Sequence, residues 1–421
     1  MSNTLSLILL STNTFIIDNL IYSTVTLPNP LMADYKLISI TLLYQNGNNV
    51  IVQTNNKGSF MLSADLNSIS LYYDPIIEKW LKLNLRNTSM FPTVFQTKLT
   101  YVKSPPVINM NQGWSVSLSA DGNTLASGSP EISLANSTGY VYIWIRPNNG
   151  SWAIQQQIIG DLSVIGQQQG YSVSLSGDGN TLAFGGIADN TNTGAVWIFT
   201  RSNSIWTQQG GKLVGTVSNP SQYQGCSVSL SSNGNTLAFG GYGDTSNTGA
   251  VWVFTRSNSI WTQQQKLIGT PTHVGQKQAS SVALSADGNT IAFGAGENAS
   301  QGATWIWTRS NNVWLQESKL IGTGLNSYAQ QGTSVSLSAD GNTVASGCVR
   351  DNTSNTNNTG SVLIFSRIGT LWTQQINLTT PAPYQPNEFR GWSVSLSANG
   401  NTVVSGGPFF FQNRGAVYIY N

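Results

Sequence analysis

Five acidic residues recur at one position of a repeated segment, and their carboxylates could hold a cation. Each lies in an Asn-, Thr- or Gly-rich segment such as DNTNTG or DTSNTG: Glu131, Asp189, Asp244, Glu297 and Asp351. Gathered on one face, they would form a weak candidate metal site or an acidic rim. Calcium needs six to eight oxygen ligands, so the favoured interpretation is that each side chain caps its own Asx-type turn. We therefore predict no metal and no cofactor.

Residues suited to acid–base or nucleophilic catalysis are scarce. The single histidine, His273, is expected at the surface of a linker, and no serine or cysteine shows a histidine-based activating environment. A carboxylate pair for glycoside hydrolysis would have to come from Asp161, Glu317 and Glu388, which share no motif. The sequence favours a protein that is not an enzyme, with a carbohydrate-active enzyme or a lectin as the alternative.

Aromatic residues gather where a ring of repeats would bring distant segments together. An aromatic patch beside an open channel suits stacking on sugars or anchoring a protein partner. Packing between repeats is the competing interpretation. The candidate ligand-binding residues are Trp114, Tyr171, Phe389, Trp392, Phe409, Phe410 and Phe411.

Six copies of one segment position these residues. GWSVSLSADGNTLASG is the first copy and GYSVSLSGDGNTLAFG the second. Their starts are 53 to 59 residues apart, as expected when repeats keep their strands and vary their loops. The copies begin at Gly113, Gly170, Gly225, Ala279, Gly332 and Gly391.

Each copy has the pattern of two consecutive β-hairpins. Alternating SVSLS crosses Asp-Gly-Asn or Asn-Gly-Asn and continues as TLAFG, and the glycine supplies the positive φ of the turn. GAVWVFTRSNSIWTQQQKLIG from Gly249 is typical of the second hairpin. Four strands per repeat make one propeller blade. The predicted fold class is all-β, with a six-bladed β-propeller of four-stranded blades in residues 91–421.

The ends of the repeat array predict how the ring closes. The last copy stops after its third strand, and VFQTKLTYV from Val94 resembles the fourth strand WTQQQKLIG from Trp261. We expect strand 94–102 to complete the final blade and hide its edge. Residues 1–90 predict a small separate β-domain. GSFMLSADLNSISLYY from Gly58 loosely echoes the repeat, so a seven-bladed propeller remains an alternative.

Composition and charge exclude several classes of partner. Charged residues make up 9% of the chain and its net charge is +2, without basic runs, so nucleic acid is not an expected partner. No stretch reaches membrane-spanning length, and the N-terminus lacks the features of a secretory signal. We expect a soluble protein without membrane insertion. Cys226 and Cys348 are expected to be buried thiols.

Residues that recur in every copy are assigned to the scaffold, and function is sought where the copies differ. The variable segments are the blade linkers, such as GTPTHVGQKQA, and the loops between second and third strands, which we place on one variable face. Among the recurring residues, we expect tryptophans that pack between blades with arginines stacked on their rings. The two series are Arg146, Arg201, Arg256, Arg309 and Arg367, and Trp152, Trp206, Trp261, Trp314 and Trp372.

The pattern G-x-SV-x-LS-x-DGNT-x-A-x-G followed by G-AV-W-x-F resembles the FG-GAP group of propellers, to which integrin α-chain heads belong. With WTQQQKLIGT between copies, it is similar to propeller proteins encoded by giant viruses of protists. The resemblance implies a structural protein of the virion surface or capsid that contacts the host or other virion proteins, with a protein or glycan partner on the variable face. Each copy lacks the DxDxDG calcium loop, so the family's calcium sites are not carried over.

Overall fold

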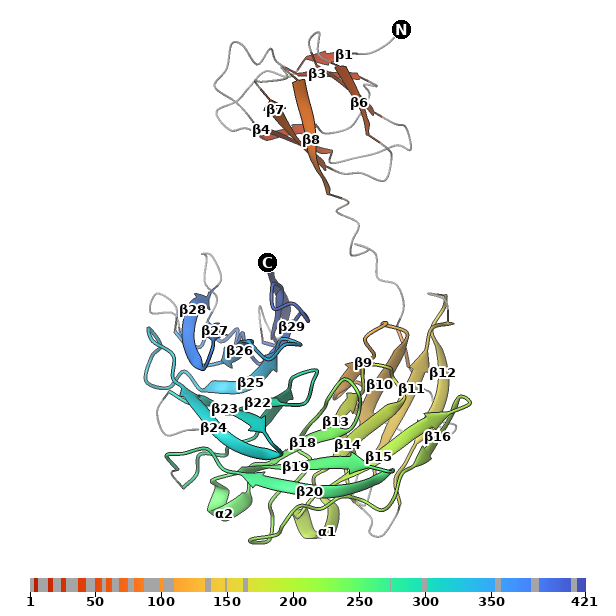
Figure 1. Ribbon diagram of the computed structural model, residues 1–421, viewed down its shortest axis with the longest axis vertical. Coiled ribbons are helices and arrows are strands. Elements are labelled where there is room, and N and C mark those ends of the chain that lie inside the picture. Colours follow the sequence, from red (N-terminus) through yellow and green to blue (C-terminus); the bar gives the residue numbers. More distant parts are fainter. Residues whose placement is uncertain are drawn as a thin grey trace. The chain divides into compact units, whose positions relative to one another are not determined.

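The structure is a computed structural model of the chain, and it divides into two units, Met1–Lys98 and Leu99–Asn421 (Figure 1). In residues 1–97 it describes only the backbone of eight strands. From Lys98 onward it describes residues 98–100, 110–132, 138–147, 150–161, 166–272, 274–296, 301–352, 357–379, 386–409 and 415–421.

The first unit contains two four-stranded sheets of mixed direction. One has the order β1-β3-β5-β6 and the other β2-β4-β7-β8. Its strands are β1 (Thr4–Ser6), β2 (Thr14–Ile17), β3 (Thr24–Leu27), β4 (Leu37–Leu42), β5 (Val50–Thr54), β6 (Gly58–Leu62), β7 (Ser68–Asp74) and β8 (Lys79–Arg86). The segment from Gly58 that echoes the repeat forms β6 and β7, which belong to different sheets. It is therefore no blade, and the seven-bladed alternative is wrong.

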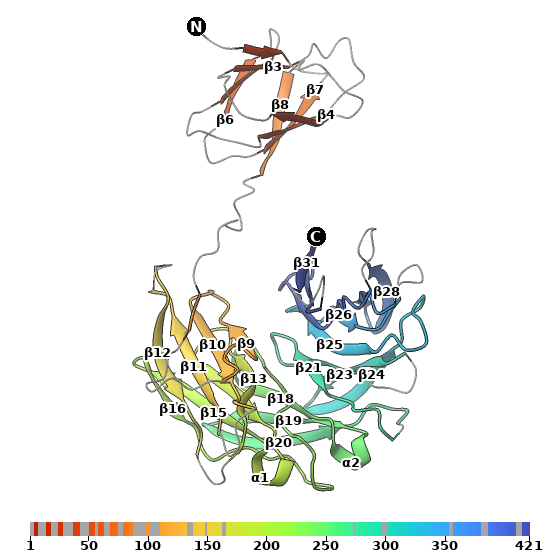
Figure 2. The same ribbon diagram turned by 180° about the vertical axis from the view of Figure 1, so that it is seen from behind.

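The second unit is a six-bladed β-propeller, as predicted, and its antiparallel blades follow one another in chain order (Figures 1 and 2). Blades one to three contain β9 (Val116–Leu118), β10 (Thr124–Ser129), β11 (Tyr140–Ile145) and β12 (Ala153–Ile158); β13 (Gln169–Leu175), β14 (Thr181–Gly186), β15 (Ala195–Ser202) and β16 (Ile205–Gln208); and β17 (Ser227–Leu230), β18 (Thr236–Gly241), β19 (Ala250–Ser257) and β20 (Ile260–Leu267).

Blades four to six contain β21 (Ser281–Leu284), β22 (Thr290–Ala295), β23 (Ala303–Ser310) and β24 (Val313–Leu320); β25 (Gln331–Leu337), β26 (Thr343–Cys348), β27 (Ser361–Ile368) and β28 (Leu371–Leu378); and β29 (Ser393–Leu396), β30 (Val403–Gly407) and β31 (Ala416–Tyr420). Two four-residue helical turns, α1 (Asp189–Asn192) and α2 (Asp244–Asn247), lie between the second and third strands of blades two and three.

The first hairpin of each blade is fixed by its Asp or Asn turn. Ser119 Oγ donates to Asp121 Oδ1 at 2.5 Å, the amide of Asn123 donates to the same oxygen at 3.0 Å, and Gly122 has φ of +71°. In blade three, Asn233 accepts the same two bonds. The turn residues are structural because the side chain closes the turn on itself.

The hydrophobic core lies between blades rather than within them. Val196 and Ile198 of blade two belong to one buried cluster with Leu230 of blade three, and comparable clusters join the other consecutive blades. The first strands are also tied side chain to backbone, since the amide of Leu230 donates to Ser174 Oγ at 3.0 Å. Cys226 and Cys348 are buried free thiols, as predicted, and burial raises the pKa of Cys226 to about 11.

The recurring arginines and tryptophans link the outer strands, which confirms their assignment to the scaffold. The Arg256 guanidinium lies 5.3 Å from the ring centre of Trp261, and Trp261 Nε1 donates to Gln209 of the preceding blade at 3.0 Å. The other four pairs stack in the same way, with Arg Cζ 5.0 to 5.3 Å from the ring centre.

The sixth sheet has three strands in the described residues. The predicted closing strand 94–102 lies mostly outside them, and the described part, residues 98–100, is not in a strand. Among the described residues no helix is long and apolar enough to span a membrane.

Candidate functional site

A glutamine at the end of the linkers into blades two to five anchors the chain where it enters the next blade, and Arg390 has this position before blade six. Gln278 Oε1 accepts from the amide of Gly269 at 2.7 Å, and its Nε2 donates to the carbonyl of Gly269 at 2.8 Å. Gln224 bonds Gly215 in the same way, and both glutamines are fully buried. This anchor fixes the backbone of the residue that comes just before it.

That preceding residue adopts a left-handed conformation in every blade, although it is never glycine. Such a φ is uncommon for large side chains and persists only where the surroundings hold it. The amide of Lys277 donates to the Asn247 carbonyl at 2.8 Å, and that of Phe389 donates to Asn358 at 3.0 Å. The six residues and their φ values are Asn111 (54°), Gln168 (56°), Tyr223 (56°), Lys277 (52°), Gln330 (56°) and Phe389 (52°).

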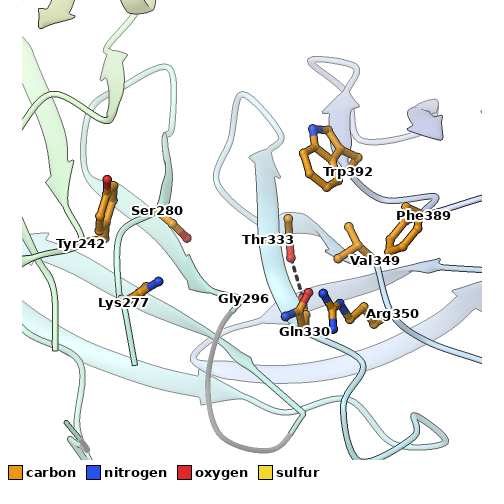
Figure 3. A pocket seen from close by; sticks show the side chains of 10 residues that line it. All are labelled: Tyr242, Lys277, Ser280, Gly296, Gln330, Thr333, Val349, Arg350, Phe389 and Trp392. Atoms are coloured by element: carbon orange, nitrogen blue, oxygen red, sulfur yellow. Dashed lines mark hydrogen bonds between the residues drawn. The ribbon is translucent and has the colours of Figure 1, made fainter. Parts of the chain in front are cut away.

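Three of these six left-handed residues line a pocket of about 400 Å³ beside blades three to six (Figure 3). They are joined there by the residue after the repeat start in the same three blades, which is Ser280, Thr333 or Trp392. Loops between second and third strands complete the wall with Tyr242, Gly296, Val349 and Arg350. The pocket thus lies where two variable repeat positions meet the variable loops.

Two aromatic residues, Phe389 and Trp392, form one wall of the pocket, and Phe409 packs against both. Phe409 makes edge-on ring contacts with Trp392 at 5.8 Å and with Phe389 at 5.4 Å. Trp392 remains 52% exposed. Three predicted ligand-binding residues therefore lie together, with Phe409 in contact with the other two.

The other predicted aromatic residues are not part of this wall. Trp114 and Tyr171 form a separate pair with ring centres 5.6 Å apart, and burial raises the pKa of Tyr171. Neither lines the pocket. Phe410 and Phe411 lie outside the described residues.

The acidic series is engaged in the scaffold. Asp244 is fully buried, accepts from Gln222 Nε2 at 2.7 Å and pairs with Lys266 Nζ at 2.8 Å. Asp189 has the equivalent bonds to Gln167 and Lys212, both at 2.8 Å.

The rest of the acidic series includes two more buried carboxylates. Asp351 accepts from Ser361 Oγ at 2.7 Å. Glu131 is also buried, and Glu297 lies outside the described residues. Among the described residues no group of three or more His, Cys, Asp or Glu could hold a metal ion.

The three carboxylates considered for glycoside hydrolysis each have a separate structural partner. Asp161 accepts from Trp197 Nε1 at 2.5 Å. Glu317 pairs with Arg367 at 3.0 Å. Glu388 accepts from the Tyr418 hydroxyl at 3.0 Å. His273 lies outside the described residues.

Sequence reasoning did not single out Tyr242, Lys277, Gln330 or Arg350, which line the pocket. A signal was present for two of them. Lys277 and Gln330 occupy the repeat position that reads Asn, Gln, Tyr, Lys, Gln and Phe from blade one to blade six, directly before a residue that is glutamine in five blades and Arg390 in the sixth. Variation at one position beside a nearly constant neighbour marks a residue that the scaffold does not specify.

Comparisons with known proteins identify the fold and no family. No family model and no curated protein matches the chain. Among solved structures, the chain resembles a putative 6-phosphogluconolactonase from Bacteroides uniformis ATCC 8492, with a TM-score of 0.50 and 12% identity over 84% of this chain and 88% of that one. A putative 6-phosphogluconolactonase from Bacteroides fragilis NCTC 9343 gives a TM-score of 0.45 and 13% identity over 91% and 94%. At such identities the likeness concerns the fold alone.

Proposed function

We propose that the protein is a non-enzymatic binding protein whose ligand occupies the pocket beside blades three to six. One observation carries this proposal: the scaffold holds six left-handed residues in place, yet leaves their identity free to differ between blades. The left-handed conformation is costly for side chains as different as lysine and phenylalanine. That it is kept in every blade supports a role in which each of these side chains contacts a ligand. The carboxylates that could serve glycoside hydrolysis instead hold Trp197, Arg367 and Tyr418.

The dimensions of the pocket favour a glycan over a protein as the ligand. A concave site of about 400 Å³ has the scale of small-molecule pockets, whereas protein partners generally cover about 800 Å² on each side. The exposed Trp392 ring offers a flat apolar surface on which a sugar ring can stack.

A glycan array tests this proposal. Fluorescently labelled protein should bind a subset of the array, and Trp392→Ala should weaken that binding at least about thirtyfold, since an aromatic anchor that the ligand buries contributes about 2 kcal/mol or more. Tyr328→Ala is the matched control because Tyr328 is 71% exposed and does not line the pocket. Equal binding by Trp392→Ala and wild type would refute the assignment of the pocket.

We further propose, from the resemblance of the repeats to giant-virus propellers, that the protein acts on a virion surface and contacts the host or other virion proteins. The test is immunogold labelling of purified particles that carry a tagged copy, viewed by negative-stain microscopy. Gold on intact particles supports this location. A tag found only outside particles contradicts it.

A further inference from the structure

The pocket has a charge character as well as an aromatic wall. Two of its lining side chains are cationic, Lys277 and Arg350, and none of the described lining residues is acidic. Figure 3 shows these two cations approaching from opposite sides of the pocket. Arg350 is exposed and Lys277 is half-buried.

The described carboxylates next to the pocket in the chain are turned into the scaffold, whereas Glu297, which follows Gly296, lies outside the described residues. Asp351, which follows Arg350, accepts from Ser361 Oγ at 2.7 Å and from the amides of Asn326 and Asn352. Glu388, beside Phe389, is 2% exposed and lies 3.7 Å from Arg390. These acids are committed to groups of the protein and do not occupy the pocket.

Asp244, two residues after Tyr242, is committed in the same way. It is fully buried against Lys266 and Gln222. The pocket therefore presents positive charge on one part of its wall and an apolar ring on another.

From this combination we infer that the ligand is an anionic sugar, and this inference rests on the proposed function. Its carboxylate or sulfate meets Lys277 and Arg350, and a ring face stacks on Trp392. A guanidinium binds planar oxyanions through paired hydrogen bonds, and an indole ring gives apolar contact. A pocket of about 400 Å³ accommodates one or two sugar residues.

The experiment uses pairs of glycans that differ only in the anionic group. The full-length protein is applied to an array with sialylated, uronate-containing and sulfated glycans beside their neutral parents, and affinities for the best pair are measured by calorimetry. We expect the acidic member to bind about tenfold more tightly, the effect of one charge-assisted hydrogen bond. The carboxylated and sulfated arms identify which anion is preferred.

Variants of the pocket assign this preference to its charges. Lys277→Gln and Arg350→Gln should each reduce the acidic-over-neutral ratio about threefold, and the double variant should bring it close to one. Gln330→Glu places a negative charge in the pocket without removing a cation, and it should also abolish the preference. The matched control is Gln168→Glu, at the same repeat position in blade two with the same φ of 56° and outside the pocket lining. It should keep most of the preference.

The outcomes separate this inference from the function beneath it. Equal binding of acidic and neutral glycans, still lost in Trp392→Ala, overturns the anionic sugar and leaves the binding site in place. A preference for acidic glycans that stays at its wild-type value in both Lys277→Gln and Arg350→Gln also overturns it. Binding of no glycan by the wild type refutes the glycan ligand altogether. Circular dichroism and melting temperature of each variant identify any that fails to fold.

Discussion

At the scale of single residues, the acidic series shows how a plausible metal site becomes part of a scaffold. Asp244 lies in the loop before the third strand of its blade, but its oxygens are taken by Gln222, Ser218 and Lys266. An ammonium group 2.8 Å from the carboxylate occupies the place that a cation would need. The Asx-turn interpretation from sequence foresaw a structural role, but not the lysine partner from the fourth strand.

Substitution of Asp244 should therefore affect folding rather than metal binding. Asp244→Asn keeps the acceptor for Gln222 but leaves Lys266 without its counter-charge, so we expect unfolding to become easier by about 2 kcal/mol. Urea denaturation measures this loss. A variant as stable as the wild type would show that the pair contributes no net stability.

Calcium provides the complementary test of the same residues. Because the described carboxylates already have partners in the protein, neither millimolar calcium nor a chelator should shift the melting temperature, whereas a ligand that binds only the folded state would raise it. Differential scanning fluorimetry with magnesium as the control ion is sufficient. A rise in melting temperature with calcium but not with magnesium would show that these carboxylates bind calcium after all.

The turn aspartates make stability depend on pH. The Ser338 hydroxyl and the Asn342 amide hold the pKa of Asp340 below its ordinary value, and Ser119 and Asn123 lower the pKa of Asp121. In Asp178 burial opposes this effect, but hydrogen bonds outweigh it, and the pKa is again lowered. Asp287 behaves like Asp178.

Replacing all four turn aspartates with asparagine should flatten the acid limb of the stability curve. A folded pKa below the unfolded one means that the stabilisation is present above the unfolded pKa, about 4, and is lost as the pH falls through the folded pKa. Asn233 and Asn399 already make the turn with asparagine, so stability at neutral pH should change little. Urea midpoints between about pH 5 and pH 3 measure the effect, and equal slopes for variant and wild type would contradict it.

At the scale of elements, one side-chain contact joins the outer strands of consecutive blades, and its acceptor is glutamine in blades one to three but glutamate in blade four. Gln155, Gln209 and Gln264 each accept from the tryptophan of the next blade, and in blade four Glu317 takes this place. The repeat itself therefore supplies a matched comparison for Glu317.

Glu317→Gln should cost under about 1 kcal/mol, because glutamine retains an acceptor for Trp372 and Arg367. Glu317→Ala should cost about 2 kcal/mol, because both buried donors lose that acceptor. Chemical denaturation of the two variants distinguishes them. Equal losses would mean that the charge of Glu317, and not its hydrogen-bonding shape, stabilises the contact.

The elements were largely predictable from sequence, and the pocket only partly. Asp-Gly and Asn-Gly turns between SVSLS and TLAFG determine the hairpins locally. The six repeat starts were therefore enough to predict the six blades. All three aromatic residues, Phe389, Trp392 and Phe409, were singled out from the sequence, since Trp392 and Phe389 were close in sequence and Phe409 was in the same blade. Arg350 was not predictable, because its entry into the pocket depends on packing between blades five and six.

At the scale of the whole molecule, a chain of backbone hydrogen bonds passes from blade to blade through the second residue after each first strand. The amide of Ala120 donates to Gly177 at 2.9 Å, that of Ala286 to Ala339 at 3.0 Å and that of Ala339 to Ala398 at 2.8 Å. Gly177 and Ser232 supply the steps between. Five such bonds join the six blades, and a bond from Ala398 to Ala120 would complete the ring.

The faces beside this sixth step are exposed and apolar. Val116 and Leu118 on β9 are 64% and 53% exposed, and Val417 and Ile419 on β31 are 69% and 58% exposed. Their equivalents in other blades, such as Val196 and Leu230, are buried in the clusters between blades. Burial of such surface stabilises by about 25 cal/mol per Å², so we propose that blades six and one close on each other.

A disulfide tests closure. Ala120→Cys with Ala398→Cys should oxidise within one chain, because the repeat places these positions as it places Ala286 and Ala339, whose backbones are hydrogen-bonded. The pair Ala286→Cys with Ala339→Cys is the matched positive control, and the native thiols Cys226 and Cys348 are buried and should not compete. Non-reducing gels and peptide mass mapping report the bond. If the control pair crosslinks and the seam pair does not, the ring is open in solution, and the apolar faces of β9 and β31 must be covered by something other than each other.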